Sequence, residues 1–331
     1  MINPIIFKSY DIRGLYPGEL NYETARAVGR GFVRQTKAKT VAVGRDARLS
    51  SPDLFKGLVE GIIAEGADVF DLGQVLTECL YFAVGKYFES GIMITASHNP
   101  KEYNGFKMLA RPKLASEGGV VKKNNNIEVI RGKDLQFLVE MGLPAVPEYA
   151  KQGAVRQKDI WQDYTKHILS FVDLDKIKPF KIVVDASNGV AGLAFLKVAN
   201  KLPVKIIPLN HEPDGNFPNH SPNPLAEGST DQIKKEIEKE SADFGFVFDA
   251  DADRVFLINE EGLLVRADIT LLLLAKHFLQ KSPKSAVAYN AICSKAVPEI
   301  IKKWGGKPIR TKVGSVNVRD GLLKNNGIMG G

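Results

Sequence analysis

Short apolar runs alternate with longer amphipathic stretches along most of the chain. Runs such as Thr40–Gly44, Gly91–Thr95 and Phe180–Asp185 have the length and the branched aliphatic residues of buried strands. Between such runs, stretches such as Pro52–Glu65 and Asp268–Lys281 carry apolar residues at helical spacing. Because strands and helices alternate, the pattern predicts α/β domains with largely parallel or mixed sheets.

The same rhythm predicts the remaining elements and the domain organisation. The stretch Arg111–Gly153 is dotted with proline and glycine and is expected to be irregular, which favours a boundary near residue 150. At about 100 to 200 residues per domain, the chain suits two or three domains. We predict three consecutive α/β domains over residues 1–150, 151–260 and 261–331. Further strands are expected over Ala67–Leu72, Val204–Pro208, Phe244–Phe248, Ala286–Tyr289, Pro308–Lys312 and Ile328–Met329, and further helices over Asp159–Val172, Ser294–Trp304 and Val316–Lys324.

The composition is that of a globular protein without a membrane span. Hydrophobic residues make up 44% and charged residues 25% of the sequence. No apolar run approaches the roughly 20 residues that a membrane helix needs. The first eight residues lack the basic and apolar regions of a secretory signal, so a cytoplasmic enzyme is expected. Cys79 and Cys293 are far apart in the sequence and do not have the spacing of metal ligands. We therefore expect two buried thiols and no zinc.

A modest basic excess suits a small anionic substrate. The 45 lysine and arginine residues outnumber the 38 aspartate and glutamate residues, which gives a formal charge of +7. Nucleic-acid binding would be indicated by a dense basic stripe or by interleaved aromatic residues, and we predict no nucleic-acid partner. The sequence does not indicate an oligomeric state.

Three carboxylates at alternate positions, Asp249, Asp251 and Asp253, directly follow the predicted strand Phe244–Phe248. Like charges at this spacing raise one another's pKa unless a cation neutralises them. Mg²⁺ prefers carboxylate oxygens and shares its shell with phosphate oxygens, so the loop favours a metal site for phosphate chemistry. The alternative is a solvated acidic loop. The two intervening alanines argue against it, because they add no solubility and let the backbone wrap closely.

Ser97 lies in a loop just past the predicted strand Gly91–Thr95. Pro100 keeps the residue before it out of the helical region, so we expect an exposed serine. It is either a plain loop residue or a nucleophile. The Gly-x-Ser-x-Gly sequence of a hydrolase nucleophile is not formed here. His98 is no obvious base for Ser97, because neighbouring side chains in an extended segment point apart.

Two further features leave alternatives open. A strand followed by Asp-x-Asp also fits an aspartate-nucleophile phosphohydrolase with its phosphate on Asp249. Asp253, however, occupies the position where that pattern has a small or hydroxyl residue. The stretch Glu212–Pro224, rich in proline, asparagine and glycine, is either a surface loop or a loop on the substrate side.

Six segments, read together, point to one family. They are Tyr10–Gly14, Gly44–Ser51, Thr95–Lys107, Pro213–Pro218, Asp249–Arg254 and Thr311–Gly314. In this order they closely resemble the α-D-phosphohexomutase family, from about residue 7 to the last residue. Its phosphomannomutase/phosphoglucomutase branch is nearest. The resemblance implies three consecutive mixed α/β domains around a central cleft.

The resemblance also implies a reaction and a set of site residues. The reaction is the interconversion of hexose 6-phosphate and hexose 1-phosphate, of mannose or glucose, through a phosphoserine and a hexose 1,6-bisphosphate. One Mg²⁺ per active site is implied. The implied metal ligands are Ser97, which is also the phosphoserine, and Asp249, Asp251 and Asp253. The implied catalytic residues are Lys107 as general acid/base, Arg13 and Arg254 as charge stabilisers, and His98 beside the phosphate. The implied substrate-binding residues are Tyr10, Lys312, Gly314 and Ser315.

Some positions depart from the family or stay ambiguous. Ser315 stands where many members of this branch have histidine, so hydrogen bonds to the sugar are expected to differ. Arg45 is either part of the site or a structural partner of Asp46 or Asp71. Family members continue beyond the position of Gly331 into a fourth domain. We therefore expect a C-terminally truncated member with poor turnover. The alternatives are a phosphoglucosamine mutase and a non-catalytic sugar-phosphate-binding remnant.

Overall fold

The structure is a computed structural model that describes residues 2–111, 127–140, 144–145 and 151–331. It divides into two compact units, Met1–Val255 and Phe256–Gly331, and each is described by itself. The first unit holds two β-sheets with their helices, and the second holds a smaller sheet.

The first sheet has a parallel centre and an antiparallel side. β2 (Thr40–Arg45) pairs in parallel with β3 (Asp68–Gln74) and β4 (Ser90–Ile94). β5 (Tyr103–Ala110) runs antiparallel to β4. The remaining strands are β1 (Ile12–Leu15), β6 (Glu128–Ile130) and β7 (Val155–Gln157), and the order is β1-β5-β4-β2-β3-β7 with β6 paired to β5. Since β7 pairs with β3, this sheet extends beyond the expected boundary at residue 150.

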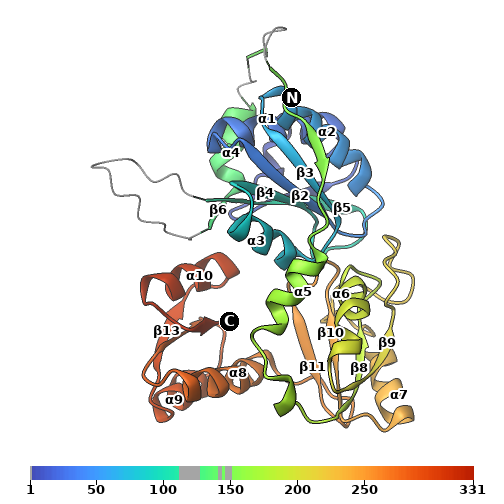
Figure 1. The fold of residues 1–331 in the computed structure, drawn as a ribbon, viewed down its shortest axis with the longest axis vertical. Helices are drawn as coiled ribbons and strands as arrows, with labels where there is room; N and C mark the ends of the chain where they lie inside the picture. The colour runs from blue at the N-terminus through green and yellow to red at the C-terminus, as the bar shows by residue number, and fades with distance from the viewer. Residues whose placement is uncertain (1, 112–126, 141–143, 146–150) are drawn as a thin grey trace. The chain divides into compact units, whose positions relative to one another are not determined.

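Helices cover both faces of this sheet (Figure 1). They are α1 (Tyr22–Thr36), α2 (Ser51–Ala64), α3 (Thr77–Lys86), α4 (Gly132–Glu140) and α5 (Trp161–Leu169), with a 3₁₀ helix at Pro4–Ile6. Val41 and Val43 of β2 are buried in the core beneath α1 and α2. Ala42, between them, is buried in the core beneath α3. Because successive side chains of a strand point to opposite faces, one strand contributes to both cores.

The expectation that residues 111–153 are irregular is wrong where the structure describes them. β6 and α4 lie in this stretch, and Leu135 and Val139 of α4 are buried in the core beneath α1 and α2. These residues stand four positions apart on one helix face, a short signal that the surrounding prolines and glycines obscured. Residues 112–126, 141–143 and 146–150 lie outside the described part of the chain.

α1 and α2 pack with their backbones in close contact. A Cβ added at Gly61 would meet the Arg26 carbonyl oxygen at 2.1 Å. We expect Gly61→Ala to lower the free energy of unfolding by about 1 to 3 kcal/mol, because the helices must move apart. Gly85→Ala in α3 is the control. Its Cβ would approach only the Ile127 side chain, at 3.4 Å, and alanine favours helix. Denaturant unfolding compares the two variants, and equal free energies of unfolding would contradict the close packing.

The second sheet brings the ends of neighbouring parallel strands to one edge. β8 (Lys181–Asp185) pairs in parallel with β10 (Phe244–Phe248) and with β9 (Lys205–Leu209). β11 (Val255–Ile258), at whose start the two units divide, follows β10 in the strand order. The loops after β8 and β10 therefore lie side by side. The helices are α6 (Ala191–Val198) and α7 (Asp231–Glu240), with 3₁₀ helices at Leu174–Lys176 and Ala199–Lys201.

The second unit is a small parallel sheet with helices packed on it. β12 (Ala286–Asn290) pairs in parallel with β13 (Lys307–Thr311) and with β14 (Met329–Gly330). The helices are α8 (Ala267–Lys281), α9 (Ala296–Lys303) and α10 (Ser315–Lys324). Val287 of β12 and Ile301 of α9 are fully buried in their common core. The predicted α/β class with parallel or mixed sheets is confirmed in all three sheets.

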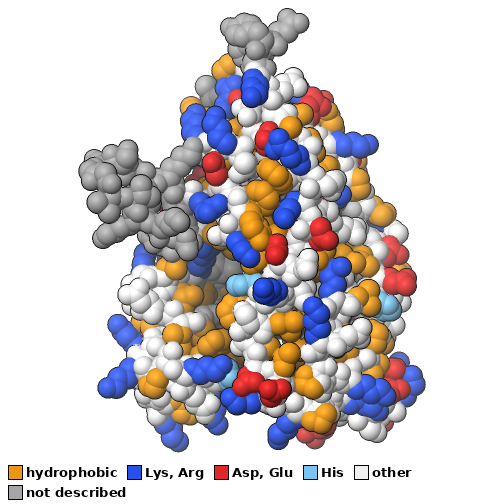
Figure 2. Space-filling view, viewed as in Figure 1, with side chains coloured by type: hydrophobic (Ala, Val, Ile, Leu, Met, Phe, Trp, Pro, Cys, Tyr) orange, Lys and Arg blue, Asp and Glu red, His pale blue; other side chains and the backbone are white. Residues whose placement is uncertain are grey.

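The surface carries charges of both signs. On the face that Figure 2 shows, lysine and arginine side chains lie among aspartate and glutamate side chains.

Cys79 is buried as expected, whereas Cys293 is partly exposed. In the described residues, every helix is too short or too polar to cross a lipid bilayer.

Candidate active site

Ser97 follows β4 and has an unusual backbone conformation. Its φ angle is 53°, in the left-handed region that residues other than glycine rarely adopt. Such a conformation costs about 1 to 3 kcal/mol and persists only where the surroundings hold it. Ser97 is 1% exposed, so the expectation of an exposed serine is wrong. It is buried because its side chain faces the carboxylates that follow β10.

Three carboxylates converge on the Ser97 hydroxyl. Asp249, Asp251 and Asp253 each offer an oxygen, and these oxygens all lie within 4.8 Å of one another. Ser97 Oγ donates a hydrogen bond to Asp249 Oδ2 at 2.6 Å and lies 3.5 Å from Asp253 Oδ1. Ala252, with a φ angle of 59°, turns the loop tightly between the second and third carboxylates. The two loops thus meet directly, although 152 positions separate Ser97 from Asp249.

Lys107 lies between two of these carboxylates. It stands on β5 opposite Met93 of β4, the strand that leads into the Ser97 loop. Its Nζ atom is 2.6 Å from Asp251 Oδ2 and 2.5 Å from Asp253 Oδ2. Asp253 therefore contacts both the Ser97 hydroxyl and the Lys107 ammonium.

The three charged groups shift one another's pKa in opposite directions. Burial raises the pKa of Asp249, and the charges of Asp251 and Asp253 raise it further. Burial also disfavours the Asp251 carboxylate, but the Lys107 ammonium, together with hydrogen bonds from Thr77 and Thr95, outweighs burial and lowers the pKa of Asp251 to about 2. Burial opposes the charge on Lys107, yet the two carboxylates raise its pKa. Lys107 is therefore an ammonium in this arrangement. Its single positive charge does not neutralise the carboxylates, so the cluster keeps an excess of negative charge.

The donor set of this cluster fits a hard divalent cation. All three acidic side chains present oxygen atoms, which Mg²⁺ prefers over nitrogen or sulfur. Asp251 Oδ2 accepts hydrogen bonds from Thr77 Oγ1 at 2.8 Å and from Thr95 Oγ1 at 3.2 Å. Asp251 Oδ1 is buried and has no hydrogen-bond partner among the described residues. A buried carboxylate oxygen without a donor is a suitable metal ligand, because a cation would satisfy it.

Two arginines border the Ser97 loop. Arg13 Nη1 donates to Asn99 Oδ1 at 2.9 Å, and Arg13 Nη2 pairs with Asp11 Oδ2 at 2.6 Å. The Arg254 backbone N–H donates to Asp249 Oδ1 at 3.2 Å, and the Arg254 side chain is 45% exposed. Both residues therefore attach to the site and carry positive charge close to Ser97.

His98 does not point away from Ser97, so that expectation is wrong. His98 Nδ1 lies 3.4 Å from Ser97 Oγ, because the left-handed backbone at Ser97 interrupts the extended segment. Burial, with the charges of Arg254 and Arg13, lowers the pKa of His98 to about 4. His98 is therefore neutral near pH 7 and adds no positive charge to the site.

Comparison with known proteins gives the family. Family models described as phosphoglucomutase/phosphomannomutase α/β/α domains I, II and III match residues 4–130, 162–262 and 266–331 in chain order. The chain belongs to the phosphoglucomutase/phosphomannomutase family. Membership confirms the resemblance found in the motifs, the three consecutive α/β domains and the predicted class of enzyme, an isomerase of phosphohexoses.

Individual relatives agree with this membership. A protein named "Phosphohexose mutases" from Xanthomonas campestris pv. campestris (strain B100) is 36% identical over 98% of this chain and 70% of its own length. The phosphomannomutase/phosphoglucomutase of Pseudomonas aeruginosa (strain PAO1) is 34% identical over 98% of this chain and 67% of its own length. A crystal structure of a phosphoglucomutase/phosphomannomutase family protein from Burkholderia thailandensis has a TM-score of 0.87 at 31% identity, covering 100% of this chain and 71% of that one.

The residues expected on the sugar side fall into two groups. Tyr10 precedes β1 in the first unit and is 37% exposed. Lys312, Gly314 and Ser315 belong to the second unit, where they connect β13 to α10. Gly314 has a φ angle of 117°, which only glycine adopts readily, and exposed Ser315 begins α10. The three therefore occupy the carboxyl end of β13.

Several residues at the site escaped the sequence analysis. Thr77, at the start of α3, belongs to no motif, so nothing in the sequence indicated its bond to Asp251. Glu78 follows it. Burial raises the pKa of Glu78 to about 8, with smaller contributions from Asp253 and Asp251. Arg45, one of the ambiguous residues, pairs with Asp71 at 2.7 Å, which is the structural alternative.

A buried ion pair between His220 and Asp185 supports the loop after β8, beside the loop that carries the three carboxylates. His220 Nε2 lies 3.0 Å from Asp185 Oδ2, at the end of β8, and His220 Nδ1 lies 2.8 Å from the Ser221 carbonyl oxygen. Both neighbours are hydrogen-bond acceptors, so a protonated ring satisfies both contacts. Burial opposes the charge, but the hydrogen bond and charge of Asp185, together with the Ser221 carbonyl, outweigh burial and raise the pKa of His220 above 6.5.

This pair predicts a pH-dependent stability. Its contribution is fully present below the unfolded pKa of His220, near 6.5, and is lost as the pH rises through the raised folded pKa. We expect His220→Gln to lower the free energy of unfolding by about 1.5 to 3 kcal/mol at pH 6 and by less at pH 9. Exposed His277→Gln is the control, with a small loss at both pH values. Denaturant unfolding at the two pH values measures the difference, and an equal loss for His220→Gln at both would contradict the ion pair.

Proposed function

We propose that this site is the phosphoryl-transfer centre of a phosphohexomutase that acts on glucose and mannose phosphates through a phosphorylated Ser97. The observation that carries the proposal is the contact between Ser97 Oγ and Asp249 Oδ2 at 2.6 Å, within a cluster of three carboxylates. A serine held in this way is shielded from water. Its hydroxyl lies where a cation bound by the carboxylates would contact a phosphate on Ser97.

Asp249, Asp251 and Asp253 would hold one Mg²⁺, together with an oxygen of phosphorylated Ser97. When bound, the ion supplies positive charge that offsets the charge on the transferring phosphoryl group. Asp251 is suited to this role because Thr77 and Thr95 fix its Oδ2 by hydrogen bonds, while its buried Oδ1 has no hydrogen-bond partner among the described residues.

Ser97 gives up the phosphoryl group in one step and regains it in the next. In the first step the bond between Ser97 Oγ and phosphorus breaks as a hexose-phosphate hydroxyl oxygen bonds to phosphorus, which yields a hexose 1,6-bisphosphate. The hydroxyl loses a proton and Ser97 Oγ gains one. In the second step the other phosphoryl group of the bisphosphate is transferred to Ser97 Oγ as its bond to the sugar oxygen breaks. The Ser97 hydroxyl loses its proton and the sugar oxygen gains one, so the net reaction is an isomerisation.

Charged side chains around Ser97 serve alignment and proton transfer. Lys107 contacts Asp253, which also faces the Ser97 hydroxyl, so Lys107 is our candidate to exchange the proton of that hydroxyl. Arg13 and Arg254 would stabilise the negative charge of the transferring group. Neutral His98 would shape the loop beside it.

Residues outside this centre would bind the substrate. Tyr10, Lys312, Gly314 and Ser315 would contact the sugar phosphate, and the partners would be small sugar phosphates. The domain boundaries near residues 150 and 260 and the cytoplasmic location stay predictions from the sequence.

A half-reaction tests the substrate class. The chain is first phosphorylated with glucose 1,6-bisphosphate in Mg²⁺ and freed of small molecules. It is then mixed with glucose 1-phosphate, mannose 1-phosphate or glucosamine 1-phosphate, and intact mass spectrometry follows the loss of phosphate. We expect the glucose and mannose compounds to discharge the chain fastest. Preferential discharge by glucosamine 1-phosphate would favour a phosphoglucosamine mutase, and discharge by none would contradict the proposal.

A further inference from the structure

The loop Pro213–Pro218 lies against the loop that follows β2, and neither loop has a part in the chemistry described above. We infer that Pro213–Pro218 is a positioning element for the reaction: it packs on Arg48, and Arg48 holds the backbone that carries Ser97. The inference rests on the proposed function of Ser97, and it assigns a role to a motif that supplies no catalytic group.

The side chain of Arg48 holds the Ser97 loop in place through hydrogen bonds to its backbone. The residue is 1% exposed, so water cannot replace its partners. Its guanidinium donates to the backbone carbonyl oxygens of Ser97 at 2.8 Å, Asn99 at 2.7 Å, Pro100 at 2.7 Å and Tyr103 at 2.9 Å, and to Asp46 Oδ2 at 3.1 Å. These bonds use all five N–H groups of an arginine, an arrangement that a lysine cannot reproduce.

The Ser97 backbone depends on this support. Its left-handed conformation is unfavourable for serine and needs surroundings that fix it. Arg48 bonds the Ser97 carbonyl itself, and Thr95 Oγ1 accepts a hydrogen bond from the Ser97 N–H at 2.8 Å. Thr95 Oγ1 in turn donates to Asp46 Oδ2 at 2.8 Å. A displacement of Arg48 and Asp46 would therefore move the hydroxyl that accepts the phosphoryl group.

Pro213–Pro218 closes the other side of Arg48. The Phe217 ring centre lies 5.3 Å from the guanidinium carbon of Arg48, within the range of a cation–π contact. A Cβ added at Gly215 would meet the Ala47 carbonyl oxygen at 2.4 Å and the Leu49 nitrogen at 2.6 Å. Only a glycine lets this loop lie directly on the backbone that carries Arg48.

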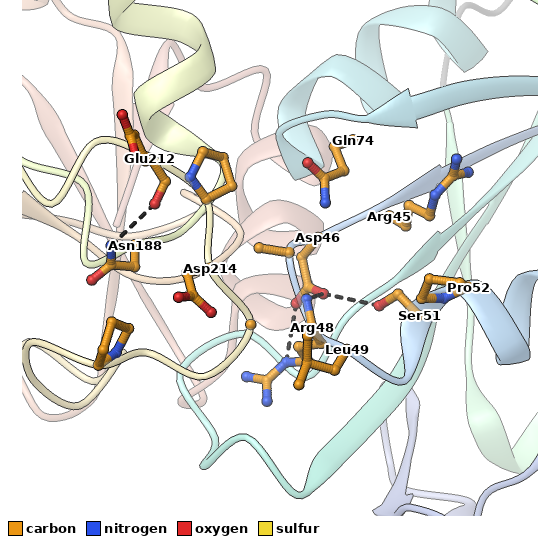
Figure 3. Close-up of a pocket in the computed structure, with 14 residues that line it drawn as sticks. Arg45, Asp46, Arg48, Leu49, Ser51, Pro52, Gln74, Asn188, Glu212 and Asp214 are labelled. Carbon is orange, nitrogen blue, oxygen red and sulfur yellow. Dashed lines mark hydrogen bonds and ion pairs between the residues drawn. The ribbon is translucent and has the colours of Figure 1, made fainter.

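The same loop is tied to the metal-binding loop. Figure 3 shows Asn188 and Asp214 across a cavity from Asp46 and Arg48, and this cavity has a volume of about 570 Å³. The Asp214 N–H donates to the Asn188 carbonyl oxygen at 2.8 Å, and the Val190 N–H donates to the Ala250 carbonyl oxygen at 2.9 Å. Pro213–Pro218 thus connects the loop that carries Ser97 to the loop that carries the three carboxylates.

The test compares Gly215→Ala with Gly18→Ala, whose added Cβ would meet nothing within 4 Å. Rapid quench and mass spectrometry measure phosphoryl transfer from glucose 1,6-bisphosphate to Ser97 in Mg²⁺, over a range of bisphosphate concentrations. In Gly215→Ala we expect the saturating rate to fall at least about 10-fold and the half-saturating concentration to change less than about twofold. Misplacing a reacting group acts on the rate rather than on binding. Gly18→Ala should behave as the unaltered chain.

Two more variants keep the test decisive if Gly215→Ala does not fold. Arg48→Lys keeps the charge beside Asp46 but loses the fork of donors, and Phe217→Leu keeps an apolar side chain but loses the aromatic face. Both should show the same fall in saturating rate at an unchanged half-saturating concentration. Rates equal to the unaltered chain, or a changed half-saturating concentration at an unchanged rate, would overturn the inference. An unaltered chain that gains no phosphate on Ser97 would overturn the proposed function instead.

Discussion

Replacing Ser97 with alanine is expected to abolish the weak mutase turnover expected of this chain with glucose 1-phosphate and mannose 1-phosphate, measured with catalytic glucose 1,6-bisphosphate and Mg²⁺. We expect the rate to fall at least about 10⁴-fold relative to the unaltered chain, because no other group replaces a lost nucleophile. Mg²⁺ binding, measured by calorimetry, should persist, because Asp249, Asp251 and Asp253 remain.

The matched control for Ser97→Ala lies on the same strand. Ser90 begins β4, is fully buried, and donates its hydroxyl to the Thr40 carbonyl oxygen at 3.2 Å. Ser90→Ala also removes a buried hydroxyl, but far along β4 from the carboxylates, so turnover should be kept. If Ser97→Ala retained turnover like this control, Ser97 could not be the phosphorylated residue.

Lys107→Met is expected to separate proton transfer from metal binding. Lys107 pairs with Asp251 and Asp253, so its ammonium competes with a cation for the same oxygens. Without it, Mg²⁺ affinity should stay the same or rise. The rate of phosphoryl transfer to and from Ser97 should fall about 10²- to 10⁴-fold, the usual contribution of a general acid or base.

Calorimetry with Mg²⁺ and single-turnover transfer measure the two effects of Lys107→Met. Exposed Lys56 on α2 provides the control Lys56→Met, which should change neither quantity. A Lys107→Met chain that loses Mg²⁺ affinity would show that Lys107 supports the carboxylates and does not compete with the cation.

Much of the fold could be predicted because its elements carry local signals. Strands such as β4 and β10 contain continuous apolar runs, and α8 has helical periodicity, so each is readable without tertiary information. α4 was missed because it is short and its apolar residues do not mark one face: Leu135 and Val139 are buried, whereas Phe137 is exposed. β7 was missed because its three residues are exposed and gain their structure from pairing with β3.

The site could be predicted in its residue types but not in its geometry. The carboxylates indicated a cation because charge repulsion is a local property of the loop. The left-handed backbone of Ser97, its burial and its approach to His98 arise from contacts with segments distant in sequence. Arg48 shows the same limit. Its motif was visible, but its bonds to the carbonyls of Ser97 and Tyr103 exist only in the folded chain.

Non-glycine residues with left-handed backbones gather around this centre. Ser97 and Ala252 lie in the two reacting loops, and Asn188 and Phe217 lie in the segments that brace them. Each such residue is unfavourable by itself and is kept only by its surroundings. Their grouping indicates that the folded chain uses stability gained in its cores to hold the serine and the carboxylates in one arrangement.

The most direct measurement is the position of the phosphate that the chain gains from glucose 1,6-bisphosphate in Mg²⁺. Intact mass spectrometry gives the number of phosphoryl groups, and peptide fragmentation locates them. The proposed mechanism predicts one phosphoryl group, stable to hydroxylamine, on the peptide that contains Ser97. A hydroxylamine-sensitive phosphate on Asp249, or no phosphate at all, would contradict it.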